Sequence, residues 1–243
     1  MNLIFDVDDT LYDQLEPFGE AYRQIFGKYN YDYSLDDLFI RSRLYSDEVF
    51  DQVSRGEMTD QQMHIYRITH AFADLGVEVP EEEAIRFQNC YADNQQRLRV
   101  DPRMEEVLNF ARDQGIRIGI ITNGPAEHQA DKVRQLRMER WVQPQDVFIS
   151  GKLGIAKPHV GIFRAVEQGM HIEASDTYYL GDSYANDVVG AKQAGWYSIW
   201  INRHQLTLPD DVEFQPDYVV NKGESVLDVV KGILAKTTEK DTL

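Results

Sequence analysis

The sequence predicts an α/β protein with a doubly wound, mostly parallel sheet and an α-helical insertion after the first strand. From about residue 100 onward, short apolar runs rich in β-branched residues alternate with helical patterns, as in a doubly wound sheet. Residues 14–99 contain few such runs and have the apolar spacing of amphipathic helices. The length of 243 residues fits one large domain or one domain carrying a smaller insertion, at about 100 to 200 residues per domain.

Six apolar runs are expected to form buried strands. They cover residues 3–7, 116–122, 147–150, 178–180, 198–201 and 218–220. Patterns of helical length and spacing lie at 104–114, 127–136, 160–168, 185–194 and 225–234. Because strands that alternate with helices pair in parallel, their carboxyl ends should meet at one edge of the sheet.

The insertion interrupts this alternation directly after the first strand. It contains four amphipathic helical patterns, at 17–29, 34–55, 59–75 and 80–98. A structureless loop of this length is implausible inside a compact domain. We therefore expect a core of residues 1–13 and 100–243, with residues 14–99 forming a helical cap over the end of the first strand.

The charge balance and the cysteine count exclude several classes of protein. The chain has 41 acidic and 25 basic residues and a formal net charge of −16, so its field repels nucleic acid polymers and anionic membrane surfaces. A small phosphorylated molecule is compatible, because local cations and a metal outweigh a distant field. The single cysteine, Cys90, excludes an internal disulfide and a CxxC metal framework. The amino terminus lacks the apolar stretch of a signal peptide, and no apolar run approaches the ~18 residues of a membrane span. We therefore expect a cytoplasmic protein.

The first strand ends in a cluster of carboxylates, within Asp6-Val7-Asp8-Asp9-Thr10. Ligands bind at the carboxyl edge of open α/β sheets, and Asp6 and Asp8 project to the same side of extended chain. Paired carboxylates can divide labour, one attacking as a nucleophile and the other moving a proton. The alternative is an acidic turn in which Asp9 or Thr10 caps the following segment.

Polar side chains also follow later strands. Thr122 and Asn123 end the second strand at a helix start, where hydroxyl, amide and backbone N–H groups can cradle a phosphate or merely cap the helix. Lys157 precedes another helix, either as a point charge for phosphate or as a surface lysine. Asp182 lies at the tip of the fourth strand, with Asp187 about one helical turn beyond it; capping is again the alternative.

The order of these motifs along the chain resembles that of the haloacid dehalogenase-like (HAD) hydrolase superfamily. The motifs are residues 6–10, Thr122, Lys157 and residues 181–187. The pattern of the superfamily is strand-DxDx(T/V), strand-(S/T), Lys, then strand-GDxxx(x)D. The resemblance covers roughly residues 1–13 and 100–221, and the insertion stands where the commonest cap of the superfamily is found. It implies a Rossmann-like sheet of strand order 3-2-1-4-5. Residues 118–124, 156–158 and 200–203 are similar to the subgroup that contains pyrimidine 5'-nucleotidases.

The resemblance implies a role for each motif residue. Asp6 attacks phosphorus and forms an aspartyl phosphate, while Asp8 protonates the leaving oxygen and then deprotonates water. Thr122, the N–H of Asn123 and the ammonium of Lys157 hold the phosphoryl group, by positioning and electrostatics.

Charge arithmetic separately favours a metal. Two like charges ~4 Å apart repel by about 1 kcal/mol in water and about 4 kcal/mol at an effective dielectric of 20, so Lys157 alone does not balance four clustered aspartates. Oxygen ligands favour Mg²⁺. In the family pattern the ligands are the carboxylates of Asp6 and Asp182 and the backbone carbonyl of Asp8, and Asp187 supports the metal or Lys157 from behind.

The leading hypothesis is a Mg²⁺-dependent phosphatase of a small phosphorylated metabolite, such as a nucleoside monophosphate or a sugar phosphate. Asp8 disfavours a dehalogenase, because a halide leaving group needs no acid. Phosphonate cleavage through a cap lysine is disfavoured because Lys28, at an apparent helix end, is the insertion's only lysine. A phosphomutase and a catalytically silent binding or regulatory module remain alternatives. The insertion is rich in tyrosine and arginine, and two interpretations of these residues are open. They either contact a base, a sugar or a second anion of the substrate, or the tyrosines pack in the core of the insertion and the arginines lie on its solvated face. The residues are Tyr22, Tyr45, Tyr66, Arg41, Arg43 and Arg67.

Overall fold

The computed structural model describes residues 1–28, 32–209 and 211–240. The chain divides into two compact units. The α/β unit consists of residues 1–13 and 98–243, and the helical unit consists of residues 14–97. Within the described residues, no helix has the length and apolar character needed to cross a membrane.

The α/β unit is built on one parallel sheet with the strand order β3-β2-β1-β4-β5-β6. Its strands are β1 Asn2–Phe5, β2 Arg117–Thr122, β3 Val147–Ile149, β4 Thr177–Gly181, β5 Tyr197–Asn202 and β6 Tyr218–Asn221. The predicted order 3-2-1-4-5 is confirmed, and β6 extends the sheet beyond β5. Because every pair is parallel, all the carboxyl ends lie at one edge, the location expected for a ligand site.

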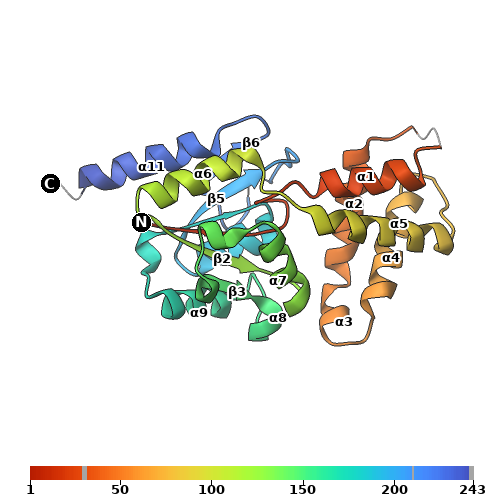
Figure 1. The fold of residues 1–243 in the computed structure, drawn as a ribbon, viewed down its shortest axis with the longest axis horizontal. Helices are drawn as coiled ribbons and strands as arrows, with labels where there is room; N and C mark the ends of the chain where they lie inside the picture. The colour runs from red at the N-terminus through yellow and green to blue at the C-terminus, as the bar shows by residue number, and fades with distance from the viewer. Residues whose placement is uncertain (29–31, 210, 241–243) are drawn as a thin grey trace. The chain divides into compact units, whose positions relative to one another are not determined.

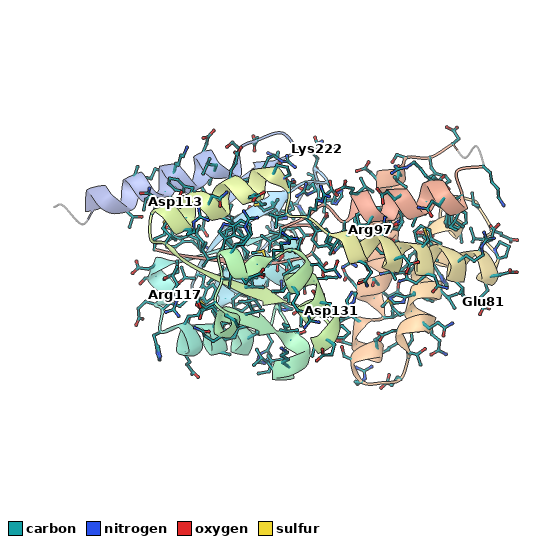
Figure 2. All side chains as sticks on the ribbon, viewed as in Figure 1. Glu81, Arg97, Asp113, Arg117, Asp131 and Lys222 are labelled. Carbon is teal, nitrogen blue, oxygen red and sulfur yellow. The ribbon has the colours of Figure 1, made fainter. Side chains whose placement is uncertain are left out.

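Helices cover both faces of this sheet (Figure 1). They are α6 Pro102–Asp113, α7 Ala126–Gln135, α8 Ser150–Leu153, α9 Val160–Met170, α10 Val189–Gln193 and α11 Val226–Lys240. Side chains alternate along β1, so Leu3 and Phe5 join the core under α6 and α11, whereas Ile4 joins the core under α9 and α10. Figure 2 labels Arg117, where β2 begins, and Asp131, on α7, on opposite sides of this unit.

The helix expected over 185–194 has a different form. A π-helix spans Tyr184–Val188 before α10 begins. The N–H groups of Asp187 and Val188 both donate to the carbonyl of Ser183, at 2.8 and 3.3 Å, which widens the turn. Asp187 consequently folds back toward the end of β4, where its Oδ2 accepts from the Ser183 N–H at 2.9 Å. Single π turns often occur at functional sites.

The helical unit contains α1 Leu15–Ile25, α2 Leu35–Glu48, α3 Phe50–Ser54, α4 Asp60–Ala73, α5 Glu81–Asn94 and a final 3₁₀ turn, Gln95–Arg97. The predicted helix 34–55 is interrupted at Val49, whose φ of −103° and ψ of 4° are not helical. The predicted helix 17–29 ends at Ile25, and position 29 lies outside the described residues. An aromatic core joins the helices, with Phe18 in edge-to-face contact with Phe39 and Phe87.

Several polar side chains of the helical unit bond to neighbours within the unit. These bonds join Arg41 and Tyr45 to Asp74, and Tyr66 to Glu48. Arg67 is buried, donates to Gln88 Oε1 at 2.8 Å and lies 5.7 Å from the ring centroid of Tyr91. Arg67 is therefore part of the interior of this unit, while Arg41 belongs to its solvated face.

Candidate active site

Three of the expected aspartates meet at the carboxyl edge of the sheet. Asp6 follows β1, and its N–H donates to the carbonyl of Leu180 at 2.8 Å, which continues the parallel ladder by one residue. Carboxylate oxygens of Asp6, Asp182 and Asp187 lie within 4.8 Å of one another. Asp6 and Asp187 are buried and Asp182 is partly exposed, so the cluster has one side toward solvent.

Lys157 lies inside this cluster. Its ammonium donates to Asp6 Oδ1 at 2.7 Å, Asp187 Oδ1 at 2.7 Å and the Tyr179 hydroxyl at 2.8 Å. These three acceptors match the three donors of an ammonium group. Burial alone would lower the pKa of Lys157, but the charges of Asp187 and Asp6 outweigh it and raise that pKa well above its usual range. Lys157 is therefore a permanent buried cation.

Thr122 and Asn123 follow β2 at the same edge. Asn123 holds the backbone of Lys157 on both sides, since its Nδ2 donates to the Lys157 carbonyl at 3.0 Å and its Oδ1 accepts from the Lys157 N–H at 2.9 Å. This second role of Asn123 was not evident from the sequence. The Thr122 hydroxyl is fully buried and has no hydrogen-bond partner within the described residues. A buried unpaired hydroxyl at a strand end is suited to receive a ligand atom.

Asp8 has contacts of its own, separate from those of Asp6. Its Oδ1 accepts from Lys132 Nζ at 2.6 Å and from the Tyr12 hydroxyl at 2.5 Å. Its Oδ2 accepts from Lys132 Nζ at 2.8 Å and from Gln129 Nε2 at 2.9 Å. Burial would raise the pKa of Asp8, but the charge and hydrogen bonds of Lys132, with those of Tyr12 and Gln129, hold it well below its usual range.

Lys132 and Gln129 were not among the site residues predicted from the sequence. They lie three residues apart on α7, so they share one helix face, and both are buried. The sequence did contain one sign of this arrangement. Counted from Gln129 as position i, Lys132 is at i+3 and the apolar Val133 and Leu136 are at i+4 and i+7, so the polar pair lies on the apolar face of the helix. Long polar side chains on helices are usually solvated at their ends, so the pattern alone does not predict burial.

Lys132 also corrects the charge count, which had treated Lys157 as the lone balancing cation. The group contains four carboxylates and two ammoniums, with a formal charge of −2: Asp6, Asp8, Asp182 and Asp187 with Lys132 and Lys157. Burial, with repulsion by Asp187 and Asp8, raises the pKa of Asp6 to about 7 against the attraction of Lys157. The donor set is entirely oxygen and its formal charge equals that needed by one divalent cation, so the residues fit Mg²⁺.

Gly181 makes room for the Asp187 carboxylate. A Cβ at position 181 would lie 2.3 Å from Asp187 Oδ2. The backbone of Asp182 is fixed from the next strand, because Trp200 Nε1 donates to the Asp182 carbonyl at 2.7 Å. The end of β4 and the π turn together set the positions of both aspartates.

A family model described as haloacid dehalogenase-like hydrolase matches residues 1–195, most of the chain. The chain belongs to the haloacid dehalogenase-like hydrolase family. This confirms the family inferred from the motifs.

Similar proteins cover nearly the whole chain. A glyceraldehyde 3-phosphate phosphatase from Methanocaldococcus jannaschii is 26% identical over 231 residues, 95% of this chain and 97% of that protein. The pyrimidine 5'-nucleotidase YjjG from Escherichia coli is 29% identical over 215 residues, 86% of this chain and 89% of that protein. The solved structure of the HAD-hydrolase YfnB from Bacillus subtilis, bound to magnesium, has a TM-score of 0.67 at 23% identity and covers 96% of this chain and 97% of that one. At that identity the structural likeness shows the fold alone.

Proposed function

We propose that this HAD-like chain is a Mg²⁺-dependent phosphomonoester hydrolase that acts on a small phosphorylated metabolite through an aspartyl phosphate. The observation that carries the proposal is the pair Asp6 and Asp8, two residues apart, each bonded to a different buried lysine. Carboxyl groups kept in separate environments can take separate roles as nucleophile and proton carrier.

The reaction proceeds in two displacements at phosphorus. The Asp6 carboxylate attacks phosphorus, the ester P–O bond breaks, and Asp8 delivers a proton to the leaving oxygen. Asp8 then takes a proton from the water that attacks the aspartyl phosphate, and release of inorganic phosphate restores Asp6. The donors around Asp8 stabilise its ionised form, which accepts the proton of that water. The protonated Asp8 formed in this way is the species that delivers a proton to the leaving oxygen of the next substrate.

The phosphoryl oxygens are received by groups at the ends of β2 and of the loop before α9. The unpaired hydroxyl of Thr122 and the N–H of Asn123 donate to them, and Lys157 supplies positive charge beside Asp6. Fixed donors of this kind stabilise the charge that develops on a transferring phosphoryl group.

The residues that would hold Mg²⁺ are the carboxylates of Asp6 and Asp182 and the backbone carbonyl of Asp8. When bound, the ion supplies positive charge that offsets the carboxylates and orients a substrate oxygen. Asp187 acts from behind this set through its bond to Lys157. The proposal is supported by the carboxylate oxygens of Asp6, Asp182 and Asp187, which lie within 4.8 Å of one another.

The substrate class is a small phosphate monoester. Relatives similar to this chain are named for phosphatase activity on glyceraldehyde 3-phosphate, phosphoserine and pyrimidine nucleotides. The dehalogenases among the structural neighbours are 17 to 21% identical and show the fold alone. The aspartate at position 8 favours an ester, whose alkoxide leaving group needs a proton, over a halide.

The test is a panel of phosphorylated metabolites assayed by release of inorganic phosphate, with Mg²⁺ and with EDTA. We expect turnover with Mg²⁺ and its loss in EDTA. Asp6→Asn should lower turnover by at least about 10³-fold, because it removes the nucleophile. The exposed Asp113→Asn serves as the matched control and should retain activity.

Other outcomes would contradict the proposed function or indicate a different one. Turnover retained by Asp6→Asn contradicts the nucleophile role. Isomerisation of a sugar phosphate without phosphate release indicates a phosphomutase. Binding of phosphorylated ligands with no conversion across the panel indicates a silent binding module.

A further inference from the structure

We propose that Lys132 is a positioning residue for Asp8, fixing the carboxylate that carries protons in the reaction. This inference rests on the proposed function and adds a residue that acts through Asp8. The two aspartates after β1 then have one lysine each, Lys157 for Asp6 and Lys132 for Asp8.

The geometry at Asp8 is that of a fully held carboxylate. Lys132 bonds to both of its oxygens, at 2.6 and 2.8 Å, and bridges them. Tyr12 adds a bond to Oδ1 and Gln129 adds one to Oδ2. With two donors on each oxygen, rotation of the carboxylate breaks charge-assisted bonds, which are about twice as strong as neutral ones.

The burial of Lys132 distinguishes it from an ordinary surface lysine. Its side chain is 7% exposed, and that of Asp8 is 18% exposed. An ammonium group buried without a partner is strongly unfavourable, so the placement of Lys132 on the inner face of α7 depends on a nearby acid. Asp8 meets that need from a segment more than one hundred residues away in the sequence.

Gln129 links this contact to the expected phosphate loop. Its Nε2 donates to Asp8 Oδ2 and to the Asn123 carbonyl, at 2.9 Å each. The approach is close, because a Cβ at Gly124 would lie 2.8 Å from the same nitrogen. Through Gln129 and Lys132, α7 therefore fixes Asp8 relative to the backbone that follows β2. A misplacement of about 1 Å in such a site can cost about 10²-fold in rate.

The leaving group provides a readout that a merely structural lysine would not change. Proton delivery matters for an alkyl ester, whose alkoxide is a poor leaving group, and hardly for a dinitrophenyl ester, whose phenolate leaves unaided. If Lys132 acts through Asp8, its loss must slow the alkyl ester far more than the aryl ester.

The experiment measures kcat and KM of Lys132→Met and Lys132→Arg on both esters. Lys132→Met should lower kcat on the alkyl ester by about 10²-fold, within the range for general acid–base catalysis, with KM changed less than about threefold. The loss on the aryl ester should be below about tenfold, and Lys132→Arg should recover part of the alkyl rate. Lys152→Met, at an exposed lysine of α8, should match the wild type on both.

A stability cycle tests the same contact without turnover. Lys132→Met should lower the urea midpoint, and adding Asp8→Asn should restore part of it, because the unpaired buried charge disappears. If Lys132→Met does not fold, Gln129→Ala tests the same role. It should slow the alkyl ester more than the aryl ester, with a smaller loss of kcat than Lys132→Met.

Equal losses on the two esters, or unchanged kinetics with no coupling to Asp8, would overturn the positioning role. In that case the proposed function stands, provided that the wild type turns over and Asp6→Asn does not. An inactive wild type, or an active Asp6→Asn, instead refutes the proposed function, and the positioning role falls with it.

Discussion

The Tyr179 hydroxyl completes the contacts of the Lys157 ammonium. It accepts from Lys157 at 2.8 Å and donates to the Ile121 carbonyl at 3.1 Å. Tyr179, on β4, thus connects the lysine to β2, which lies on the other side of β1 in the sheet. Because all three groups are buried, removing the hydroxyl leaves a donor and an acceptor with no access to water.

Tyr179→Phe should therefore destabilise the protein by about 1 to 3 kcal/mol, the cost of leaving buried polar groups unpaired. Urea unfolding measures the difference. Tyr197→Phe is the matched control, since Tyr197 is 38% exposed, and should change stability by less than about 0.5 kcal/mol. Equal effects of the two substitutions would mean that the Tyr179 hydroxyl has no structural role.

The stability of the α/β unit depends on pH through Asp101. Burial would raise its pKa, but hydrogen bonds from Arg103 and Arg203 outweigh burial and lower the pKa to about 2. An unfolded aspartate has a pKa of about 3.9. A lowered folded pKa contributes stability above the unfolded value, and that contribution is lost as the pH falls from about 4 to about 2.

Asp101→Asn should therefore be less stable than the wild type at pH 5, and the difference between their urea midpoints should shrink as the pH falls toward 2. Asparagine retains the capping ability of the side chain at the start of α6, so the change isolates the charge. A difference that stays constant from pH 5 to pH 2.5 would contradict this assignment.

Residues at strand ends could be predicted from the sequence, and partners on a distant helix could not. The expected Asp6, Asp182 and Lys157 follow apolar runs or precede a helix, and parallel pairing brings such positions to one edge. Lys132 has no such marker. Only the three-dimensional path of α7 shows that its inner face meets Asp8.

At the scale of elements, the junction from β4 to α10 sets the geometry of two aspartates. Gly181 ends β4 without a side chain, and the π-helix Tyr184–Val188 returns Asp187 to the space that a Cβ would take. A regular helix was expected over 185–194. The sequence has no pattern that distinguishes a π turn, because the extra residue per turn depends on the bonds of Ser183 and on the position of Asp187.

Gly181→Ala should lower both stability and phosphatase activity, because its Cβ would lie 2.3 Å from Asp187 Oδ2 and must displace the carboxylate that holds Lys157. We expect a loss of about 1 to 3 kcal/mol, as for overpacked interiors, and at least about a tenfold drop in kcat.

Gly232→Ala is the control for this substitution. Gly232 is exposed on α11 with no atom within 4 Å of the added Cβ, so alanine should stabilise the helix by about 0.5 to 1 kcal/mol. Calorimetry and kinetics on the two variants compare the sites directly. An active and equally stable Gly181→Ala would show that the site does not need this space.

At the scale of the whole molecule, a chain of net charge −16 contains a partly buried group whose own formal charge is −2. A cation that binds the native state alone stabilises it by mass action, by about 2.7 kcal/mol at one hundred times its Kd. The doubly wound topology was predictable from the alternation of apolar runs and helical patterns, and the strand order from the family resemblance. The addition of β6 beside β5 depended on long-range pairing, which a local pattern does not specify.

Saturating Mg²⁺ should raise the Tm of the α/β unit by several degrees, at about 2 to 4 °C per kcal/mol for a protein of this size. Asp182→Asn removes one carboxylate of the cluster, so it should lose most of this rise without losing stability in EDTA. Asp228→Asn, at an exposed position on α11, should keep the full rise. Equal shifts in both variants would indicate general screening of the acidic surface instead of a site.

The claim that Asp6 becomes phosphorylated is tested most directly by trapping the intermediate. The Asp8→Asn enzyme is mixed with dinitrophenyl phosphate and Mg²⁺, quenched in acid within milliseconds, digested and examined by peptide mass spectrometry. The good leaving group lets the first step proceed without an acid, while loss of the base slows the second. We predict a phosphoryl group on Asp6. A phosphoryl group on another residue, or phosphate release with none trapped at any time, would contradict the account.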